Sequence, residues 1–302
     1  MSLNNRIQTA WLALLLLTLC VNSQAYAIVV VDDLGQRLEL DKPVETIIAL
    51  SPHLTELVFE AGAGEKLVAT VEYADFPEAA RSITRVGSYN TWDIEKIMTM
   101  KPDVVLVWLS ANGIAAVERL RQLGFKVYVS EPRAFDDISR TIRDIGRMAG
   151  VADMAELKAL HFEKVIAGLA EKYRNAKKIR LFYQVWSRPL VTVNGQQLIS
   201  QVFDLCGGEN VFAALPALAP VISTEALLLE NPDVIIGSAG QQEKRQWLKQ
   251  WRNWPSMKAV KNDNLFLVEP DVLARQSSRM LQGARQVCEI LQQVRNRRMK
   301  ND

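Results

Sequence analysis

The feature that most constrains this chain is a pattern that occurs twice. Residues 95–107 carry EKIMTMKPDVVLV and residues 225–237 carry EALLLENPDVIIG. Each copy predicts a short helix, a stop at Pro-Asp and an apolar strand, because the residue before a proline is unfavourable in a helix. A second pair follows the same order, VFEAGAGE at 58–65 and VFDLCGGE at 202–209. Two pairs of matching segments thus occur in the same order along the chain. Because the distance between the two members differs from one pair to the other, they predict two lobes that are similar but not identical.

Short apolar runs alternate with helical patterns in both halves of the chain. The first half predicts strands at 46–50, 67–71, 104–108 and 127–130, with helices at 55–61, 93–100 and 114–123, after a strand–turn–strand unit at 29–40. The second half predicts strands at 179–185, 191–193, 234–237 and 265–268, and a last helix at 278–293. Such alternation is typical of α/β proteins whose parallel sheets are covered on both faces.

Between the two halves lie about 40 residues of helical pattern, which Gly150 divides. Apolar residues at helical spacing include Ile138, Ile142 and Ile145 in the first part and Leu157 and Leu160 in the second. The predicted organisation is an N-terminal α/β lobe at 28–135, a bridging helix at 136–177 and a C-terminal α/β lobe at 178–302. Two lobes joined in this way leave a cleft, which is a common place for a ligand.

The first residues have the features of a secretory signal peptide. Arg6 precedes an apolar run at 11–20, and Ala25-Tyr26-Ala27 supplies a small-residue cleavage site, which places the signal peptide at 1–27. The run is short for a membrane span, although an uncleaved anchor is the alternative. Lipidation of Cys20 is a further alternative, with bulky Leu19 in front of it. An exported protein is the favoured interpretation.

Processing at that site would leave two cysteines, Cys206 and Cys288. In an oxidising compartment two thiols often pair, and a disulfide between them would close a loop of about 80 residues. The alternative is two separate buried thiols. The disulfide is the favoured interpretation.

Several classes of function are disfavoured by what the chain lacks. The 36 basic and 34 acidic residues give a net charge of +2, and nucleic acid is not an expected partner. Two histidines, His53 and His161, are too few for a multi-histidine zinc site. Motifs for a serine hydrolase, a zinc protease and a P-loop are missing. A hydrolase that uses Cys206 stays as an alternative and would need a histidine base beside it.

Aromatic and polar residues gather at or after the ends of the predicted strands. They are Tyr73, Tyr89, Trp92, Trp108, Trp186, Asp271 and Arg275. Flat rings with a few polar groups suit a large, planar, partly apolar ligand, and ligands of open α/β sheets bind at the carboxyl ends of strands. Trp247, Trp251 and Trp254 share one helix face, which we expect to pack on the second lobe.

The sequence resembles the class III periplasmic binding proteins of ABC importers, most closely the cobalamin-binding members. The resemblance rests on residues 47–56, 102–108 and 206–212 and extends over essentially all of the chain after residue 27. It implies two rigid lobes joined by one long helix. It also implies ligand contacts at Tyr73, Tyr89, Trp108, Asp271 and Arg275, with Val191 and Ala219 standing where the family has aromatic residues.

The resemblance further implies that cobalamin or a related corrinoid is the transported ligand, with no cofactor, no bound metal and no enzymatic activity. It implies a monomer in the periplasm that delivers ligand to an ABC permease in the inner membrane. Glu95 and Glu225 match the glutamates that dock on permease arginines, and Cys206 and Cys288 match the disulfide of the family. The two glutamates also favour the helix macrodipole. A heme or siderophore receptor is the alternative function.

Overall fold

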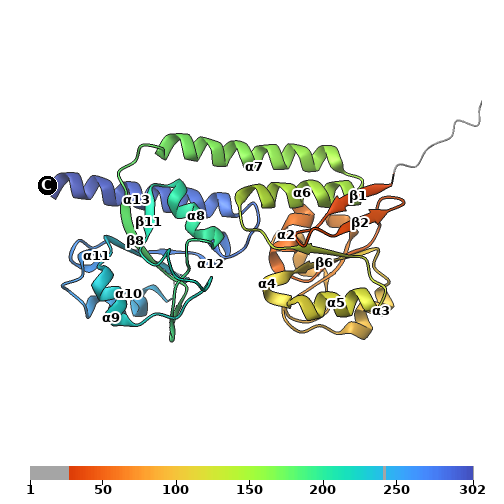
Figure 1. The fold of residues 1–302 in the computed structure, drawn as a ribbon, viewed down its shortest axis with the longest axis horizontal. Coiled ribbons are helices and arrows are strands. Elements are labelled where there is room, and N and C mark those ends of the chain that lie inside the picture. The colour runs from red at the N-terminus through yellow and green to blue at the C-terminus, as the bar shows by residue number, and fades with distance from the viewer. Residues whose placement is uncertain (1–26, 241–242, 302) are drawn as a thin grey trace, which may run out of the picture.

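The computed structural model describes residues 27–240 and 243–301, which form two α/β lobes side by side (Figure 1). The α/β fold class predicted from the repeat is confirmed. The signal peptide predicted for residues 1–27 and the alternative at Cys20 lie almost entirely outside the described residues. Among the described residues, no helix combines the length and the apolar character that a membrane crossing requires.

The N-terminal lobe contains a five-stranded parallel sheet in the order β5-β4-β3-β6-β7. Its strands are β3 (Ile47–Ala49), β4 (Leu67–Thr70), β5 (Thr84–Arg85), β6 (Val104–Trp108) and β7 (Val127–Ser130), and a separate antiparallel hairpin joins β1 (Ile28–Val31) to β2 (Arg37–Leu40). Its helices are α2 (Pro52–Glu60), α3 (Ile94–Met100), α4 (Leu109–Asn112) and α5 (Ile114–Gln122), with 3-10 turns η1 (Gly64–Lys66) and η2 (Glu78–Ser82). Strands β3 and β7 are buried throughout, as expected of a sheet covered on both faces.

The C-terminal lobe contains a four-stranded parallel sheet in the order β11-β8-β12-β13. Its strands are β8 (Ile179–Gln184), β11 (Gly208–Asn210), β12 (Val234–Ser238) and β13 (Leu265–Val268), and a short ribbon pairs β9 (Trp186–Ser187) with β10 (Leu190–Val191). Its helices are α8 (Leu198–Leu205), α9 (Thr224–Glu230), α10 (Lys244–Arg252), α11 (Lys258–Lys261), α12 (Pro270–Leu273) and α13 (Met280–Asn301).

The sequence repeat has a physical basis in the two sheets. Helices α3 and α9 end at the left-handed residues Lys101 and Asn231, with φ of 47° and 45°, and Pro-Asp follows each. Asp103 then accepts the backbone N–H of Thr46 at 2.9 Å, just before β3. In the same way, Asp233 accepts the N–H of Arg180 at 3.2 Å in β8. In each lobe the aspartate of the Pro-Asp pair therefore fastens the incoming strand to its neighbour.

The helical segment between the sheets consists of two helices, α6 (Phe135–Ala149) and α7 (Ala152–Tyr173), and the predicted break at Gly150 is present with φ of 73°. Helix α6 packs on α2 and β1 of the N-terminal lobe, whereas α7 reaches α8 and α13 of the C-terminal lobe. Figure 1 shows α7 running along one side of both lobes. Helix α7 alone is therefore the long helix that joins the lobes.

The face of α7 that packs differs from the one that apolar spacing predicts. Leu157 and Leu160 are exposed, and the buried positions include Ala155 and Ala159. The reason is a close approach of the helices, since a Cβ added at Gly146 of α6 would lie 2.1 Å from the Cβ of Ala155. Small residues, rather than the large apolar ones, set this interface.

One hydrophobic core runs through both lobes. It includes Ile47 and Leu106 of the first sheet, Phe162 and Tyr173 of α7, and Leu181 of the second sheet. The predicted disulfide Cys206–Cys288 is present and joins the end of α8 to α13, with 4.7 Å between the Cα atoms. The shared core therefore joins the two lobes, and the disulfide fixes α8 to α13 within the C-terminal lobe.

Candidate functional site

The predicted ligand residues come from the carboxyl ends of strands in both sheets. Tyr73 follows β4, Tyr89 follows β5, and Trp108 ends β6, whereas Asp271 and Arg275 follow β13. The structure brings these residues together in two groups, one built around Arg275 and one around Trp108. Helix α2 connects the groups, because it contributes one buried side chain to each.

The first group centres on Glu56, a residue of α2 whose side chain is 2% exposed. Its carboxylate accepts hydrogen bonds from Arg275 Nη1 at 2.8 Å and Arg279 Nη1 at 3.2 Å. The hydroxyl of Ser277 donates to the same carboxylate. The three donors belong to the segment that leads into α13, so Glu56 joins the N-terminal lobe to the C-terminal lobe.

Further acidic groups surround the same arginines. Arg275 pairs with Asp75 and with Asp271, each at 3.1 Å, and Arg279 lies 3.7 Å from Asp271. The guanidinium of Arg279 also lies over the ring of Phe76 at 4.5 Å. Burial would lower the pKa of Arg275, but the hydrogen bond and charge of Glu56 raise it above the ordinary value. Arg275 therefore stays charged.

The second group centres on Trp108, which is half-buried at the end of β6. His53 packs against it edge to face, with 5.1 Å between ring centroids. The amide of Asn112 accepts the backbone N–H of Trp108 at 2.9 Å and donates to the carbonyl of Tyr89. Tyr89 and Trp108 are thus connected through one side chain, and the ring of Tyr89 remains exposed.

His53 lies in the first turn of α2, two residues after the cap Ser51, whereas the sequence predicts this helix only from residue 55. Its Nδ1 is 3.1 Å from the hydroxyl of Ser51. Burial, together with the charge of Arg275, lowers its pKa from 6.5 to about 3. His53 is therefore a neutral ring beside Trp108 at neutral pH.

Tyr73 has a left-handed backbone with φ of 63°, and its side chain is 73% exposed. A positive φ is uncommon for an aromatic residue, and such strained residues cluster at functional sites. The same loop supplies Asp75 and Phe76 to the arginine group. Tyr73 therefore lies at the margin of that group with its ring free to contact a ligand.

A cavity of about 710 Å³ opens at the carboxyl ends of β8 and β12 in the C-terminal lobe. Trp186 lines it with a side chain that is 64% exposed, and its indole N–H donates to the carbonyl of Arg188 at 3.1 Å. Trp186 also pairs across the β9–β10 ribbon with Val191. The exposed ring of Trp186 therefore lies beside Val191, a position at which the resemblance predicts an aromatic residue.

Gln184 holds the floor of this cavity in place. Its Oε1 accepts the indole N–H of both Trp247 and Trp251 at 2.8 Å, and its amide donates to Ser187. Trp247 and Trp251 are buried in the core of the second lobe, as predicted, whereas Trp254 is 37% exposed. Trp247 also lines the cavity, and both buried tryptophans support its floor through Gln184.

Glu95 and Glu225 occupy equivalent places in the first turns of α3 and α9, and both are exposed. Hydrogen bonds from its own backbone N–H and from Ser223 lower the pKa of Glu225. Helices α3 and α9 lie on different lobes, both on the side away from α7 (Figure 1). The structure therefore presents one carboxylate on each lobe on the same side of the molecule.

Sequence reasoning missed Glu56, Arg279 and Gln184. Arg279 had a local signal, because it stands four residues after Arg275 on a helix-forming segment. Glu56 had none, since its partner Arg275 lies 219 residues away. Cys206 is bonded to Cys288 and has no free thiol for the alternative hydrolase. Among residues 27–240 and 243–301 we find no cluster of His, Cys, Asp or Glu that could hold a metal ion.

The chain is similar in sequence to known binding proteins. The sequence profile of the family described as "Periplasmic binding protein" matches residues 47–272. A vitamin B12-binding protein of Vibrio vulnificus is 35% identical over 257 residues, 85% of this chain and 93% of its own length. A Vibrio cholerae relative with the same name is 36% identical over 250 residues, 82% of this chain and 90% of its own.

Solved structures give the same result. The periplasmic vitamin B12-binding protein BtuF of Vibrio cholerae superposes with a TM-score of 0.79 and 35% identity, over 84% of this chain and 98% of that one. The periplasmic heme-binding protein RhuT of Roseiflexus superposes with a TM-score of 0.73 at 18% identity, over 83% and 98%. The second likeness concerns the fold alone.

The buried carboxylate gives a prediction about stability. Replacing Glu56 by Gln removes the charge that balances Arg275 and Arg279, and breaking a buried ion pair in this way costs about 3–5 kcal/mol. Urea denaturation should therefore show a free energy of unfolding lower by about that amount. The control is Asp75→Asn, which removes a half-exposed partner of Arg275 and should cost about 1 kcal/mol or less. Equal losses for the two variants would contradict the assignment.

His53 gives a prediction about pH. The unfolded chain binds a proton on this residue below pH 6.5, whereas the folded protein does so only near pH 3. Folding is therefore less favourable as the pH falls through this window, and His53 should account for about 2 kcal/mol between about pH 7 and about pH 5. Denaturation at both pH values should show that the free energy of unfolding decreases from the higher to the lower pH. This decrease should be smaller by that amount in His53→Gln than in the unaltered protein. An unchanged drop would mean that His53 ionises normally in the folded state.

Proposed function

The chain belongs to the periplasmic binding protein family, and on that premise we propose that it captures cobalamin or a related corrinoid between its lobes for delivery to an ABC permease. The observation that carries the proposal is the similarity along most of the chain to vitamin B12-binding proteins, including BtuF. In keeping with the family, we propose that residues 1–27 direct export to the periplasm and that the mature protein acts as a monomer. The alternatives, a heme or siderophore receptor, are supported by the fold alone.

The site chemistry supports a corrinoid. A corrin ring is broad and flat, with apolar faces and amide groups around its edge. In this proposal the rings of Tyr73, Tyr89 and Trp108 cover a face, whereas Asp271 and Arg275 offer hydrogen-bond partners for the amides. The positive charge of Arg275 is already balanced by Glu56, Asp75 and Asp271. A neutral, amide-rich edge therefore suits this group better than the strongly anionic chelate of a siderophore.

We propose that Trp186 supplies an aromatic contact from the C-terminal lobe. Its ring is exposed, tethered through its indole N–H and adjacent to Val191. A rigid exposed ring loses little conformational freedom when a ligand packs on it. Trp186 would thus replace an aromatic contact that the family has at the position of Val191.

Replacing the aromatic contacts tests the ligand site. Truncating an aromatic anchor typically costs about 2–4 kcal/mol of binding free energy, roughly 30-fold to 1000-fold in affinity. Trp108→Ala and Trp186→Ala should each weaken cobalamin binding by at least about tenfold in calorimetric titrations. The control is Phe162→Ala, a buried aromatic residue of α7 outside the proposed site, which should lower thermal stability and leave affinity almost unchanged. Full affinity in both site variants would show that the site is misassigned.

We also propose that Glu95 and Glu225 dock the two lobes on basic pockets of the permease. Charge-assisted contacts of this kind set orientation and association rate. Reversing both charges, Glu95→Lys with Glu225→Lys, should abolish cobalamin uptake and leave cobalamin affinity nearly unchanged. The control double variant, Asp153→Lys with Glu289→Lys, makes the same charge change at exposed positions of α7 and α13 and should transport normally. Normal uptake by the first variant would remove the docking assignment.

A further inference from the structure

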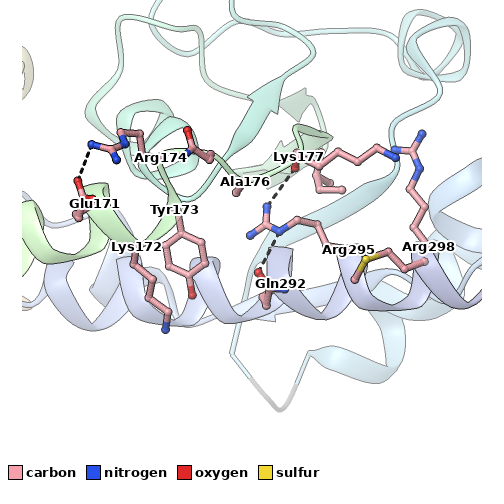
Figure 2. A pocket seen from close by; sticks show the side chains of 12 residues that line it. Glu171, Lys172, Tyr173, Arg174, Ala176, Lys177, Gln292, Arg295 and Arg298 are labelled. Carbon is pink, nitrogen blue, oxygen red and sulfur yellow. Dashed lines mark hydrogen bonds and ion pairs between the residues drawn. The ribbon is translucent and has the colours of Figure 1, made fainter.

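A second cavity, of about 520 Å³, lies on the C-terminal lobe between the end of α7, the segment before β8 and the last turns of α13. Figure 2 shows its side chains, with Tyr173 and Lys172 coming from α7 and Arg295 and Arg298 from α13. None of the proposed ligand or docking residues lines this cavity. It therefore needs an explanation of its own.

The cavity concentrates positive charge. Its lining contains five cationic side chains, Lys172, Arg174, Lys177, Arg295 and Arg298, and a single carboxylate, Glu171. Glu171 is paired with Arg174 at 3.0 Å. Arg298 is 3.6 Å from Asp233, and within the described residues the other three cations have no ion-pair partner. In a chain with a net charge of only +2, this local excess attracts anions.

Arg295 is only 5% exposed, so water cannot solvate the charge of its guanidinium group well. It donates only to neutral oxygens, those of Gln292 at 3.2 Å, Lys177 at 3.4 Å and Cys206 at 3.2 Å. Burial lowers its pKa, which reflects the unfavourable placement of its charge. The hydrogen bonds explain how Arg295 fastens the chain near the disulfide, but they leave its positive charge unbalanced.

Apolar surface lies beside these cations. The ring of Tyr173 stands 5.6 Å from the guanidinium of Arg295 and 5.2 Å from the ammonium group of Lys172. Ala176, Ile179 and Met299 complete the apolar part of the lining. The cavity thus combines an aromatic wall with several donors that suit the oxygens of a phosphate. A ligand with an anionic head and an apolar body matches both features.

We propose that this cavity binds a phosphate ester that carries an apolar group, with Lys177 and Arg298 holding the phosphate and Tyr173 packing against the apolar part. Two sources of such a group exist, a free organic phosphate or the headgroup of an anionic phospholipid. The proposal is independent of the corrinoid site, because the two sites share no residue.

Phenyl phosphate is the soluble probe, because it joins a phosphate to an aromatic ring. Calorimetry on the full folded protein at low ionic strength should detect saturable binding of phenyl phosphate and none of phenol. Lys177→Gln with Arg298→Gln should weaken that binding by at least about tenfold, since it removes two exposed cations of the cavity. Arg298 also forms a partly exposed ion pair with Asp233 at 3.6 Å, so thermal unfolding is followed in parallel to show that the variant is folded. The matched control is Lys158→Gln with Arg285→Gln, two exposed cations elsewhere on α7 and α13, which should keep the affinity within about twofold.

Vesicles distinguish the two sources. Sedimentation with phosphatidylcholine vesicles that contain about one quarter phosphatidylglycerol should retain the unaltered protein and the control variant, but not the cavity variant, if the headgroup of a lipid is the ligand. Binding of phenyl phosphate without vesicle retention would identify a free phosphate ester. The proposal is overturned if neither probe binds, or if the cavity and control variants bind equally.

Discussion

The ion pairs of Glu56 connect the two lobes on the side where the ligand residues gather. Glu56 belongs to α2 of the N-terminal lobe, and its partners Arg275, Ser277 and Arg279 belong to the segment that enters α13. Removing such charges from water costs several kcal/mol per ion unless hydrogen bonds satisfy them, which three donors on one carboxylate do. The lobes are also joined by α7 and by the shared hydrophobic core, which includes Leu54 and Leu57 of the same helix α2. Ion pairs and apolar packing therefore hold the two lobes together.

This arrangement prepares the proposed site before a ligand arrives. Asp271 forms an ion pair with Arg275, which Glu56 also binds. His53 packs as a neutral ring on Trp108. Gln184 fixes the floor of the second lobe through Trp247 and Trp251. Side chains that are already ordered lose less conformational freedom on binding, so more of the contact energy contributes to affinity. Ordered side chains around exposed rings therefore fit the proposed role as a corrinoid receptor.

The sequence predicts the lobes well because their repeat is local. Helix, Pro-Asp and apolar strand are encoded within 13 residues (95–107 and 225–237), and the aspartates of both copies make equivalent hydrogen bonds. The positions of Tyr73, Trp108 and Asp271 at strand ends follow from the same local pattern. The pairing of Glu56 with Arg275 does not, since it joins residues 219 apart and depends on how the lobes meet. The prediction of which face of α7 packs was wrong for a related reason. Gly146 of the neighbouring helix α6 allows close contact at Ala155, so Ala155 is buried and Leu157 is exposed.

The most direct test of the central claim is parallel calorimetry of the exported protein with cobalamin, cobinamide, heme and a ferric siderophore. The site has exposed aromatic rings and an arginine whose charge is already balanced, so it should prefer a neutral, amide-edged macrocycle. We expect saturable binding of cobalamin at one molecule per chain, weaker or equal binding of cobinamide, and no comparable binding of heme or the siderophore. Tighter binding of heme or the siderophore than of cobalamin, or no binding of cobalamin, would contradict the account.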